Sequence, residues 1–306
     1  AFAITFALHV VALALYPRIG LLDFPERYGL TRKRLPYPTG TISALCCCGF
    51  LLGTQVWTLQ LFGVISSIFA LSTVCFIDDR ARISPLVRLV THVVVGFTIF
   101  VTGTRIYSLT NPLADIGFSD VLKLDAWTLV FPDIGPLPIV SGLFTIAWIL
   151  FTVNALNWFD GIPGQTSVIS TIGFATIGFL SLSDRVDQPE VALIGFVLSG
   201  IAGASAVFEL PLPMQRIVPG DSGAMFYGLL LGVLTIYAGG KVATGFLVLG
   251  IPLIDSLIVI IRRLYAGKNP MKGSGSGEHL HHLLLARGWS TWSIIALTTG
   301  IGAAFG

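Results

Sequence analysis

Asp78 and Asp79 are two adjacent carboxylates at the edge of an apolar run that ends at Ile77. Acidic side chains at such a boundary are costly unless they bind a cation, pair with Arg, or act as acid or base. Pairing with the nearby Arg80 and Arg82 is the structural alternative. The pair is a candidate for metal binding or proton transfer.

A second polar cluster ends a later apolar run, where Asn154, Asn157 and Asp160 recur every three residues before Gly161. On a helix end this spacing places them along one side. Their oxygens are ligands suited to a hard cation such as Mg²⁺. The alternative is C-capping, in which Asn and Gly only close the helix.

Two more acids stand at or inside apolar segments. Asp221, in Pro-Gly-Asp-Ser-Gly, opens one such segment, and an N-cap role is its structural alternative. Counted back from Arg262 at the helical rise, Asp255 lies about 10 Å inside its segment. An acid there is a functional candidate, or else a buried partner for an Arg or for the backbone of a broken helix.

His279, His281 and His282 put three imidazoles within four residues, after a Gly-Ser stretch over 273–277. They could bind a transition metal or donate to phosphates or a base, and surface decoration is the plainer option. Arg32 and Lys33 either set the topology or hold an anionic headgroup.

The composition shows what must position these residues. Hydrophobic residues make up 54% of the 306 and charged residues only 11%, against about 25% charged in soluble proteins. This excludes a water-soluble enzyme, a secreted disulfide scaffold and a disordered chain. A net charge of +2 without a long basic run argues against nucleic acid. The four cysteines, all in apolar runs, are interpreted as packing residues.

Hydropathy predicts an all-α polytopic membrane protein, a single domain over 1–306 that is trimmed at both ends, with about ten spanning helices. The predicted spans are 1–16, 41–57, 61–77, 86–106, 138–156, 163–182, 191–208, 222–238, 242–261 and 292–306.

Alternate connections hold 14 and 4 basic residues, and the richer set is expected in the cytoplasm. Every polar cluster described above falls on that cytoplasmic side. In the longest outer connection, over 105–137, the runs Val121–Leu124 and Trp127–Phe131 predict a small hairpin.

Taken in order, these clusters resemble the polyprenyl-phosphate N-acetylhexosamine-1-phosphate transferases, the glycosyltransferase family 4 type. The motifs that carry the resemblance are Asp23-Phe24-Pro25, Arg32-Lys33, Pro38-Thr39-Gly40, Phe76-Ile77-Asp78-Asp79-Arg80, Asn154-Ala155-Leu156-Asn157-Trp158-Phe159-Asp160-Gly161, Gly220-Asp221-Ser222-Gly223, Pro252 to Asp255, and His279-Leu280-His281-His282.

The resemblance implies a multi-pass enzyme of the cell membrane that transfers a sugar 1-phosphate from a UDP-sugar to a polyprenyl phosphate in the bilayer. UMP is the second product, Mg²⁺ is required with Mn²⁺ as an alternative, and a homodimer is expected. The string Asn154–Gly161 favours the branch that joins UDP-N-acetylglucosamine and undecaprenyl phosphate over the phospho-N-acetylmuramoyl-pentapeptide branch.

The resemblance also carries roles over to single residues. It implies catalytic roles for Asp78, Asp79 and Asp160, metal binding by Asp221 and Asn157, nucleotide or phosphate binding by His279, His281, His282 and Asn154, lipid-phosphate binding by Lys33 and Arg32, and support from Asp255. Whether Asp78 or Asp79 acts as base, orients the acceptor or attacks first stays open.

The chain departs from the family pattern in four places. Leu35 stands where many members carry His, Thr41 replaces a second Gly, Pro163 replaces the second Asp of Asp-Gly-x-Asp-Gly, and the Gly-Ser stretch replaces a more charged segment. An inactive relative that binds UDP-sugar or lipid is therefore an alternative. A secondary transporter is another, but its sites belong near the membrane midplane in paired repeats, and neither feature is found.

Overall fold

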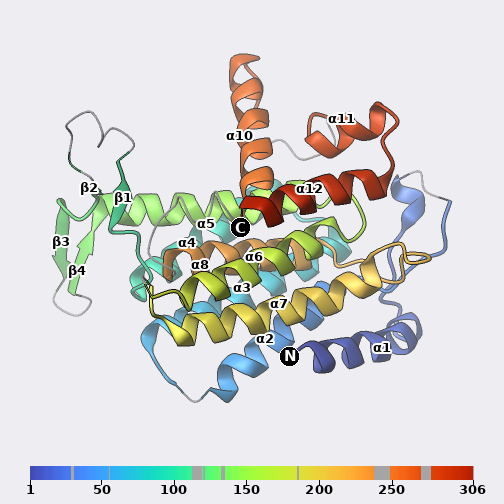
Figure 1. The fold of residues 1–306 in the computed structure, drawn as a ribbon, viewed down its shortest axis with the longest axis horizontal. Helices are drawn as coiled ribbons and strands as arrows, with labels where there is room; N and C mark the ends of the chain where they lie inside the picture. The colour runs from blue at the N-terminus through green and yellow to red at the C-terminus, as the bar shows by residue number, and fades with distance from the viewer. Residues whose placement is uncertain are drawn as a thin grey trace.

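The apolar segments fold into helices, most of which run side by side along one direction (Figure 1). The computed structural model describes residues 1–28, 31–54, 56–111, 119, 121–131, 135–184, 186–237, 249–269 and 277–305. The helices are α1 (Phe2–Arg18), α2 (Gly40–Gly53), α3 (Leu59–Ala81), α4 (Pro85–Val101), α5 (Ile139–Phe159), α6 (Gln165–Ser181), α7 (Pro189–Glu209), α8 (Asp221–Tyr237), α10 (Gly250–Tyr265), α11 (Leu280–Ala286) and α12 (Thr291–Phe305), with a short 3₁₀ helix over Pro25–Tyr28.

Three of these helices, α3, α5 and α7, are long and apolar enough to cross a membrane. Helices α1, α2, α4, α8 and α12 are apolar but shorter. The protein is therefore a mostly helical membrane protein, as its composition predicts. Part of the predicted span 242–261 lies outside the described residues. Its described part belongs to α10, which stands across the direction of the bundle (Figure 1).

Helix α8 lies at the centre of the bundle, and every residue from Ser222 to Ile236 is buried. A helix that is apolar all round is one that other helices surround. Its glycines let neighbouring backbones approach closely. A Cβ on Gly228 would stand 2.7 Å from the Thr152 carbonyl oxygen of α5, and one on Gly223 would stand 3.3 Å from the Gly40 Cα of α2.

The turn between α3 and α4 explains why two acids and one Arg share the same end of the bundle. Helix α3 ends at Ala81, and the C-cap residue Arg82 has a left-handed φ of 50°. Helix α4 starts at Pro85, and the hydroxyl of its N-cap Ser84 accepts a hydrogen bond from the Val87 N–H at 3.3 Å. Pro suits this position because its missing N–H would have no helical partner.

The predicted hairpin is only half right. Both segments form strands, but they do not pair with each other. Instead β1 (Ser108–Thr110) pairs antiparallel with β2 (Val121–Lys123), and β3 (Thr128–Phe131) with β4 (Gly135–Pro138). The strand β2 therefore pairs with the strand that precedes it, and β3 pairs with the strand that follows it.

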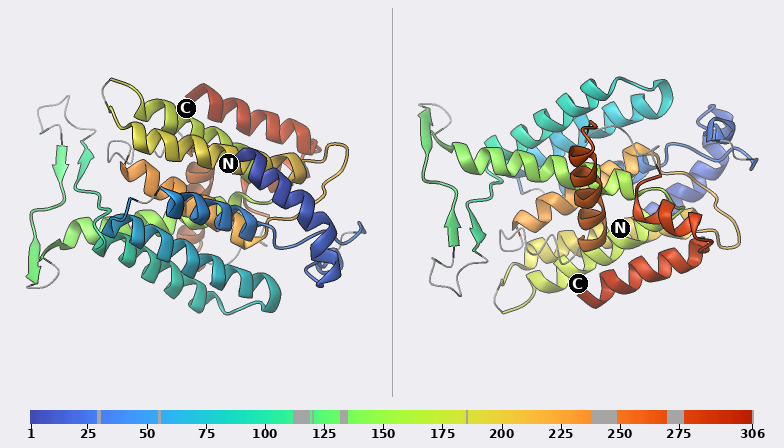
Figure 2. Two further views of the ribbon diagram at one scale, coloured as in Figure 1. Left: turned by 90° about the horizontal axis from the view of Figure 1, so that it is seen from below. Right: turned by 90° about the horizontal axis from the view of Figure 1, so that it is seen from above.

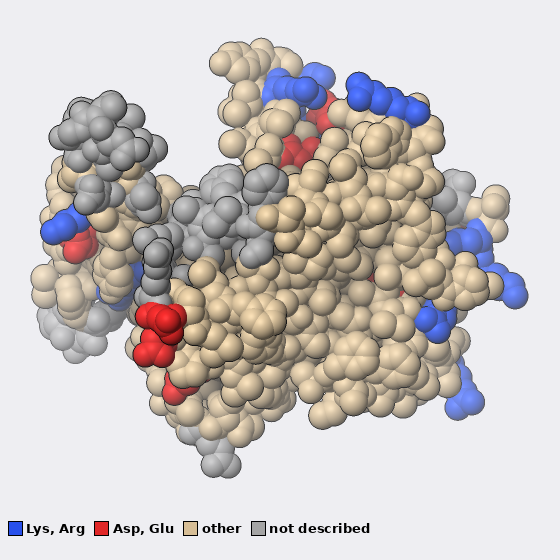
Figure 3. All heavy atoms as spheres, viewed as in Figure 1, with Lys and Arg blue, Asp and Glu red and all other residues tan. Residues whose placement is uncertain are grey.

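The two pairs of strands lie at one end of the bundle, and the loop between α1 and α2 lies at the other (Figures 1 and 2). Lys and Arg gather near that second end and around α10, while the flank of the bundle carries almost none (Figure 3). Large apolar side chains face outward on the flank, such as Phe69 at 72% and Phe179 at 68% exposure. A flank of this kind suits contact with lipid.

Candidate active site

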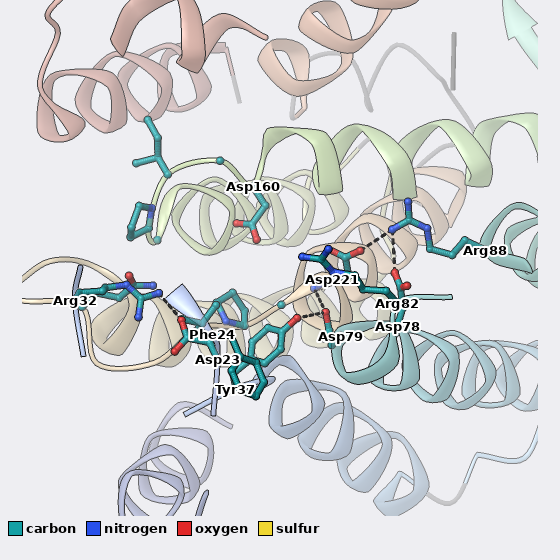
Figure 4. A pocket seen from close by; sticks show the side chains of 18 of the residues that line it. Asp23, Phe24, Arg32, Tyr37, Asp78, Asp79, Arg82, Arg88, Asp160 and Asp221 are labelled. Atoms are coloured by element: carbon teal, nitrogen blue, oxygen red, sulfur yellow. Dashed lines mark hydrogen bonds and ion pairs between the residues drawn. The ribbon is translucent and has the colours of Figure 1, made fainter. Parts of the chain in front are cut away.

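A pocket of about 990 Å³ opens at the end of the bundle that carries the α1–α2 loop, between the ends of α3, α5 and α8 (Figure 4). Its charged and polar lining side chains are Asp23, Arg32, Tyr37, Asp78, Asp79, Arg82, Arg88, Asp160, Gln215 and Asp221. Four of the predicted acids thus meet in one pocket, although they lie up to 143 residues apart. We call Asp78, Asp79 and Asp221 the acid wall.

Asp79 is held by three donors. Its Oδ1 accepts hydrogen bonds from the Tyr37 hydroxyl at 2.7 Å and from the Asp221 N–H at 2.9 Å. Its Oδ2 accepts one from the Ser222 N–H at 3.2 Å. These N–H groups belong to the first turn of α8, where a carboxylate meets unsatisfied donors and the positive end of the helix dipole. Asp79 therefore has a fixed orientation.

Asp78 and Asp221 share one cation. A single Arg88 nitrogen donates to Asp78 Oδ2 and to Asp221 Oδ2, each at 2.9 Å, and these bonds are drawn in Figure 4. The other Asp78 oxygen accepts the Ile83 N–H at 2.7 Å. Arg88 comes from the second turn of α4, so the tight α3–α4 turn is what brings it to the acids. Its charge offsets the repulsion between two carboxylates.

Asp160 faces the acid wall from the opposite side of the pocket (Figure 4). It follows the last residue of α5, outside the helix, and burial raises the pKa of its carboxyl to about 7. The Thr166 hydroxyl opposes this rise in pKa, and the negative charge of Asp221 adds to it. Asp160 therefore exchanges its proton near neutral pH.

The oxygen ligands at this pocket suit a hard cation. Asn157 lies within hydrogen-bonding reach of the Asp221 carboxyl, so the two predicted metal ligands are neighbours. Among the described residues, no group of three or more His, Cys, Asp or Glu has the arrangement of a complete metal site. Mg²⁺ commonly takes one or two carboxylates and completes its shell with water and substrate phosphates. The oxygens of Asp221 and Asn157 suit that mode.

The two predicted lipid-phosphate residues differ in position. Arg32 lines the pocket and donates to Asp23 Oδ2 at 2.6 Å. Asp23 in turn accepts the Leu35 N–H at 2.6 Å, which fixes the loop. Lys33 is exposed and does not belong to the pocket lining. Only Arg32 of this pair reaches the pocket.

We call His279 to His282 the histidine segment, and it lies beside the pocket rather than in its lining. His279 is fully buried, and its Nδ1 lies 2.8 Å from Asp255 Oδ2. The second Asp255 oxygen accepts the Leu280 N–H at 2.8 Å. The Asp255 carboxylate therefore secures the start of α11.

His281 is the imidazole that reaches the pocket wall. A Cβ on Gly161, a lining residue, would collide with His281 Nε2. Both ring nitrogens of His281 are buried, and no described residue forms a hydrogen bond with either. His282 is half-buried, with its ring 4.1 Å from that of His281. The segment therefore offers unsatisfied nitrogens next to Gly161.

Asn154, predicted to bind nucleotide or phosphate, is placed one turn deeper than the pocket. Its side-chain nitrogen donates to the Leu150 carbonyl oxygen at 2.7 Å and lies 3.2 Å from His92 Nδ1. His92 therefore has Asn154 as a partner in the interior. His9 also has an interior partner, because its Nε2 lies 2.9 Å from the Ser205 hydroxyl.

Comparison with known proteins places the chain in a family. The sequence pattern of glycosyl transferase family 4 matches residues 61–239, which is more than half of the chain. The chain belongs to glycosyl transferase family 4. The matched range contains the acid wall, Arg88, Asn157 and Asp160.

Three curated relatives of this family 4 chain have closely related names. A probable undecaprenyl-phosphate N-acetylglucosaminyl 1-phosphate transferase from Bacillus subtilis is 24% identical, over 94% of this chain and 76% of the relative. The undecaprenyl-phosphate alpha-N-acetylglucosaminyl 1-phosphate transferase of Escherichia coli K12 is 27% identical, over 73% and 58%. Decaprenyl-phosphate N-acetylglucosaminephosphotransferase from Mycolicibacterium smegmatis is 27% identical, over 70% and 54%.

Sequence reasoning missed two residues of the family 4 pocket. Arg88 was counted only as a topology determinant, and Tyr37 was passed over inside the loop before α2. A signal for Arg88 existed: it follows Asp78 by ten residues across a Ser-Pro helix start, so both residues lie at the same end of a helix pair. Tyr37 had no comparable signal, since its partner Asp79 is 42 residues away.

Proposed function

We propose that this protein transfers N-acetylglucosamine 1-phosphate from UDP-N-acetylglucosamine to undecaprenyl phosphate, producing undecaprenyl-diphospho-N-acetylglucosamine and UMP. The observation that carries the proposal is the acid wall with Arg88 and Asp160, gathered in one pocket at the basic end of an apolar bundle. Its support is membership of family 4 and the shared names of the curated relatives.

The proposed reaction depends more on electrostatic stabilisation of the phosphates than on covalent catalysis by the protein. A phosphate oxygen of the acceptor attacks the sugar-bearing phosphorus of the donor, the bond to the bridging oxygen breaks, and UMP leaves. Phosphoryl transfer of this kind depends on positioning and electrostatic stabilisation. Arg88 and Arg32 supply fixed positive charge at two ends of the pocket, and Asp79 keeps the start of α8 in place.

Mg²⁺ is proposed as the cofactor, held by Asp221 and Asn157. When bound, it would neutralise negative charge on the donor diphosphate. Asp78 then retains Arg88 as its partner, so the guanidinium stays near the reacting phosphates.

We place the pocket at the cytoplasmic face of the cell membrane, in a protein of about ten spanning segments. The support is the excess of basic residues in the connections at that end, which cells retain in the cytoplasm. An acceptor with its tail in the bilayer would then present its phosphate at the mouth of the pocket, near Arg32.

The test is UMP release by purified protein in detergent, with UDP-N-acetylglucosamine, undecaprenyl phosphate and Mg²⁺, with and without EDTA. We expect UMP only when lipid and metal are both present, and its loss in Asp221→Asn. Asp184→Asn is the matched control, because Asp184 is an exposed acid in the turn between α6 and α7. Absence of UMP with every UDP-sugar, from protein shown to be folded, would favour an inactive relative.

A further inference from the structure

Glu209 is a buried carboxyl group for which the proposed chemistry has no use. It is the last residue of α7, only 1% exposed. Its Oε2 accepts a hydrogen bond from the Ser167 hydroxyl of α6 at 2.6 Å, while its Oε1 has no hydrogen-bond partner. Among the described residues, no Lys, Arg or His forms an ion pair with it. Such a group is costly to bury.

The place of Glu209 in the fold connects it to the pocket. Ser167 belongs to the first turn of α6, beside Thr166, whose hydroxyl faces the Asp160 carboxyl. Glu209 is itself within electrostatic reach of Asp160. The first turn of α6 therefore lies between a pocket acid and the buried Glu209.

The packing around that turn leaves little freedom. Gly164 precedes α6 with a left-handed φ of +79°. A Cβ there would stand 2.7 Å from Leu210 Cδ2 and 3.1 Å from the Leu210 N. Leu210 follows Glu209 directly, so the end of α7 and the loop 160–164 cannot move independently. Close-packed interiors transmit displacements of this kind.

Apart from the Asp160 carboxyl, the loop 160–164 presents an uncharged surface to the pocket. Together with Gln215 and Val218, its residues Ile162 and Pro163 offer apolar and amide surface without a cation. Phosphates belong with Arg88 and Arg32 at the two ends, so this wall suits the neutral rings of the donor.

We propose that Glu209 is a positioning residue: through its bond to Ser167 it fixes the first turn of α6, and with it the wall 160–164 that receives the nucleotide sugar. This inference deepens the proposed function and rests on it for the identity of the donor. It does not extend to the acceptor lipid, whose phosphate would lie near Arg32.

The test compares Glu209→Ala, Glu209→Gln and Ser167→Ala by steady-state kinetics. We expect Glu209→Ala to raise KM for UDP-N-acetylglucosamine about tenfold, within the losses that misplaced binding groups cause. KM for undecaprenyl phosphate should change less than about twofold. Gln retains an oxygen that accepts from Ser167, so Glu209→Gln should stay within about threefold of the parent.

Two further variants separate positioning from general damage. Ser170→Ala is the matched control, because this buried hydroxyl on α6 has no hydrogen-bond partner to lose. The double variant Glu209→Ala with Ser167→Ala should be no worse than Glu209→Ala alone, as expected for two residues that act through one bond. An unchanged donor KM in Glu209→Ala would overturn the proposal, and so would equal losses in the Gln and Ala variants.

Binding of UDP, measured by calorimetry without acceptor, keeps this proposal distinct from the proposed function. If the parent protein binds UDP but shows no turnover, weaker binding by Glu209→Ala still supports the positioning role. Equal binding by both proteins would overturn it.

Discussion

The acid wall and the histidine segment were predicted to serve one site, yet the protein builds them differently. In the acid wall, donors from three elements satisfy the carboxylates: Tyr37, Arg88 and the first N–H groups of α8. In the histidine segment, His279 is bound to Asp255, but both nitrogens of His281 are buried without a hydrogen-bond partner among the residues that the structure describes.

The difference follows from how each region is supported. The acid wall lies on the ends of α3 and α8, two helices packed against each other in the bundle. The histidine segment begins a seven-residue helix, α11, attached to α10 through Asp255. A preorganised charge arrangement needs rigid elements beneath it. Unsatisfied imidazole nitrogens, by contrast, can form hydrogen bonds with a ligand when it binds.

The largest effect is expected from the acid wall. Asp79→Asn replaces one of the two carboxylate oxygens with an amide nitrogen. That nitrogen cannot accept a hydrogen bond from an N–H group of α8. We expect kcat to fall at least about 100-fold, as when a single oriented electrostatic group is removed. Kinetics of UMP release would measure it, beside Asp184→Asn. A loss below tenfold would mean that the orientation of Asp79 is dispensable.

Substitution of Arg88 should lower kcat less than substitution of Asp79, and it should also change the Mg²⁺ requirement. Arg88→Ala leaves Asp78 and Asp221 without their shared cation, and we expect kcat to fall about 10- to 100-fold. Less Mg²⁺ should then be needed for half-maximal activity, because a competing positive charge is gone. Arg88→Lys should retain part of kcat as a point charge. A Mg²⁺ titration of the three proteins would test this, and a higher requirement in Arg88→Ala would contradict it.

The histidine segment can be tested at His281 through the pH dependence of stability. Burial chiefly, helped by the charges of His282 and His279, lowers the pKa of His281 from 6.5 to about 4. The folded state then binds this proton less readily than the unfolded state, so its contribution to stability is present above about pH 6.5 and lost as pH falls toward 4.

Melting temperatures from pH 7 to pH 4.5 should therefore fall less steeply in His281→Gln than in the parent protein. The same substitution should raise KM for UDP-N-acetylglucosamine by about five- to tenfold, the equivalent of one hydrogen bond. His279→Gln is the contrasting variant, since it breaks the bond to Asp255 and should lower the melting temperature at every pH. Parallel pH curves for His281→Gln and the parent would refute the assignment.

The smallest effect is expected at His282. Its ring contacts that of His281 and is half-buried. At a half-buried position a ring contact contributes about 0.5 kcal/mol, the low end of its range, so His282→Ala should change KM for the donor less than about threefold. A loss as large as that of His281→Gln would show that the whole histidine segment, rather than one imidazole, meets the ligand.

Much of this could be predicted from the residues. Hydropathy predicted most of the helices. Asp78, Asp79, Asp160 and Asp221 all line the pocket, because polar residues at the ends of apolar helices gather at the ends of the bundle. The pairing of the strands could not be predicted, since each apolar run had two candidate partners. Nor could the bond between Ser167 and Glu209, because it depends on how two helices are rotated against each other.

The bond between Asp79 and the Asp221 N–H joins residues 142 positions apart, which has a consequence for biosynthesis. At ribosomal rates of about 5–20 residues per second, roughly 7–28 s separate the synthesis of the two partners. During that interval α3 has Asp79 at its end but not the helix that α8 will provide. A nascent chain is therefore catalytically silent until α8 has been inserted, however early Asp78 and Asp79 reach the membrane.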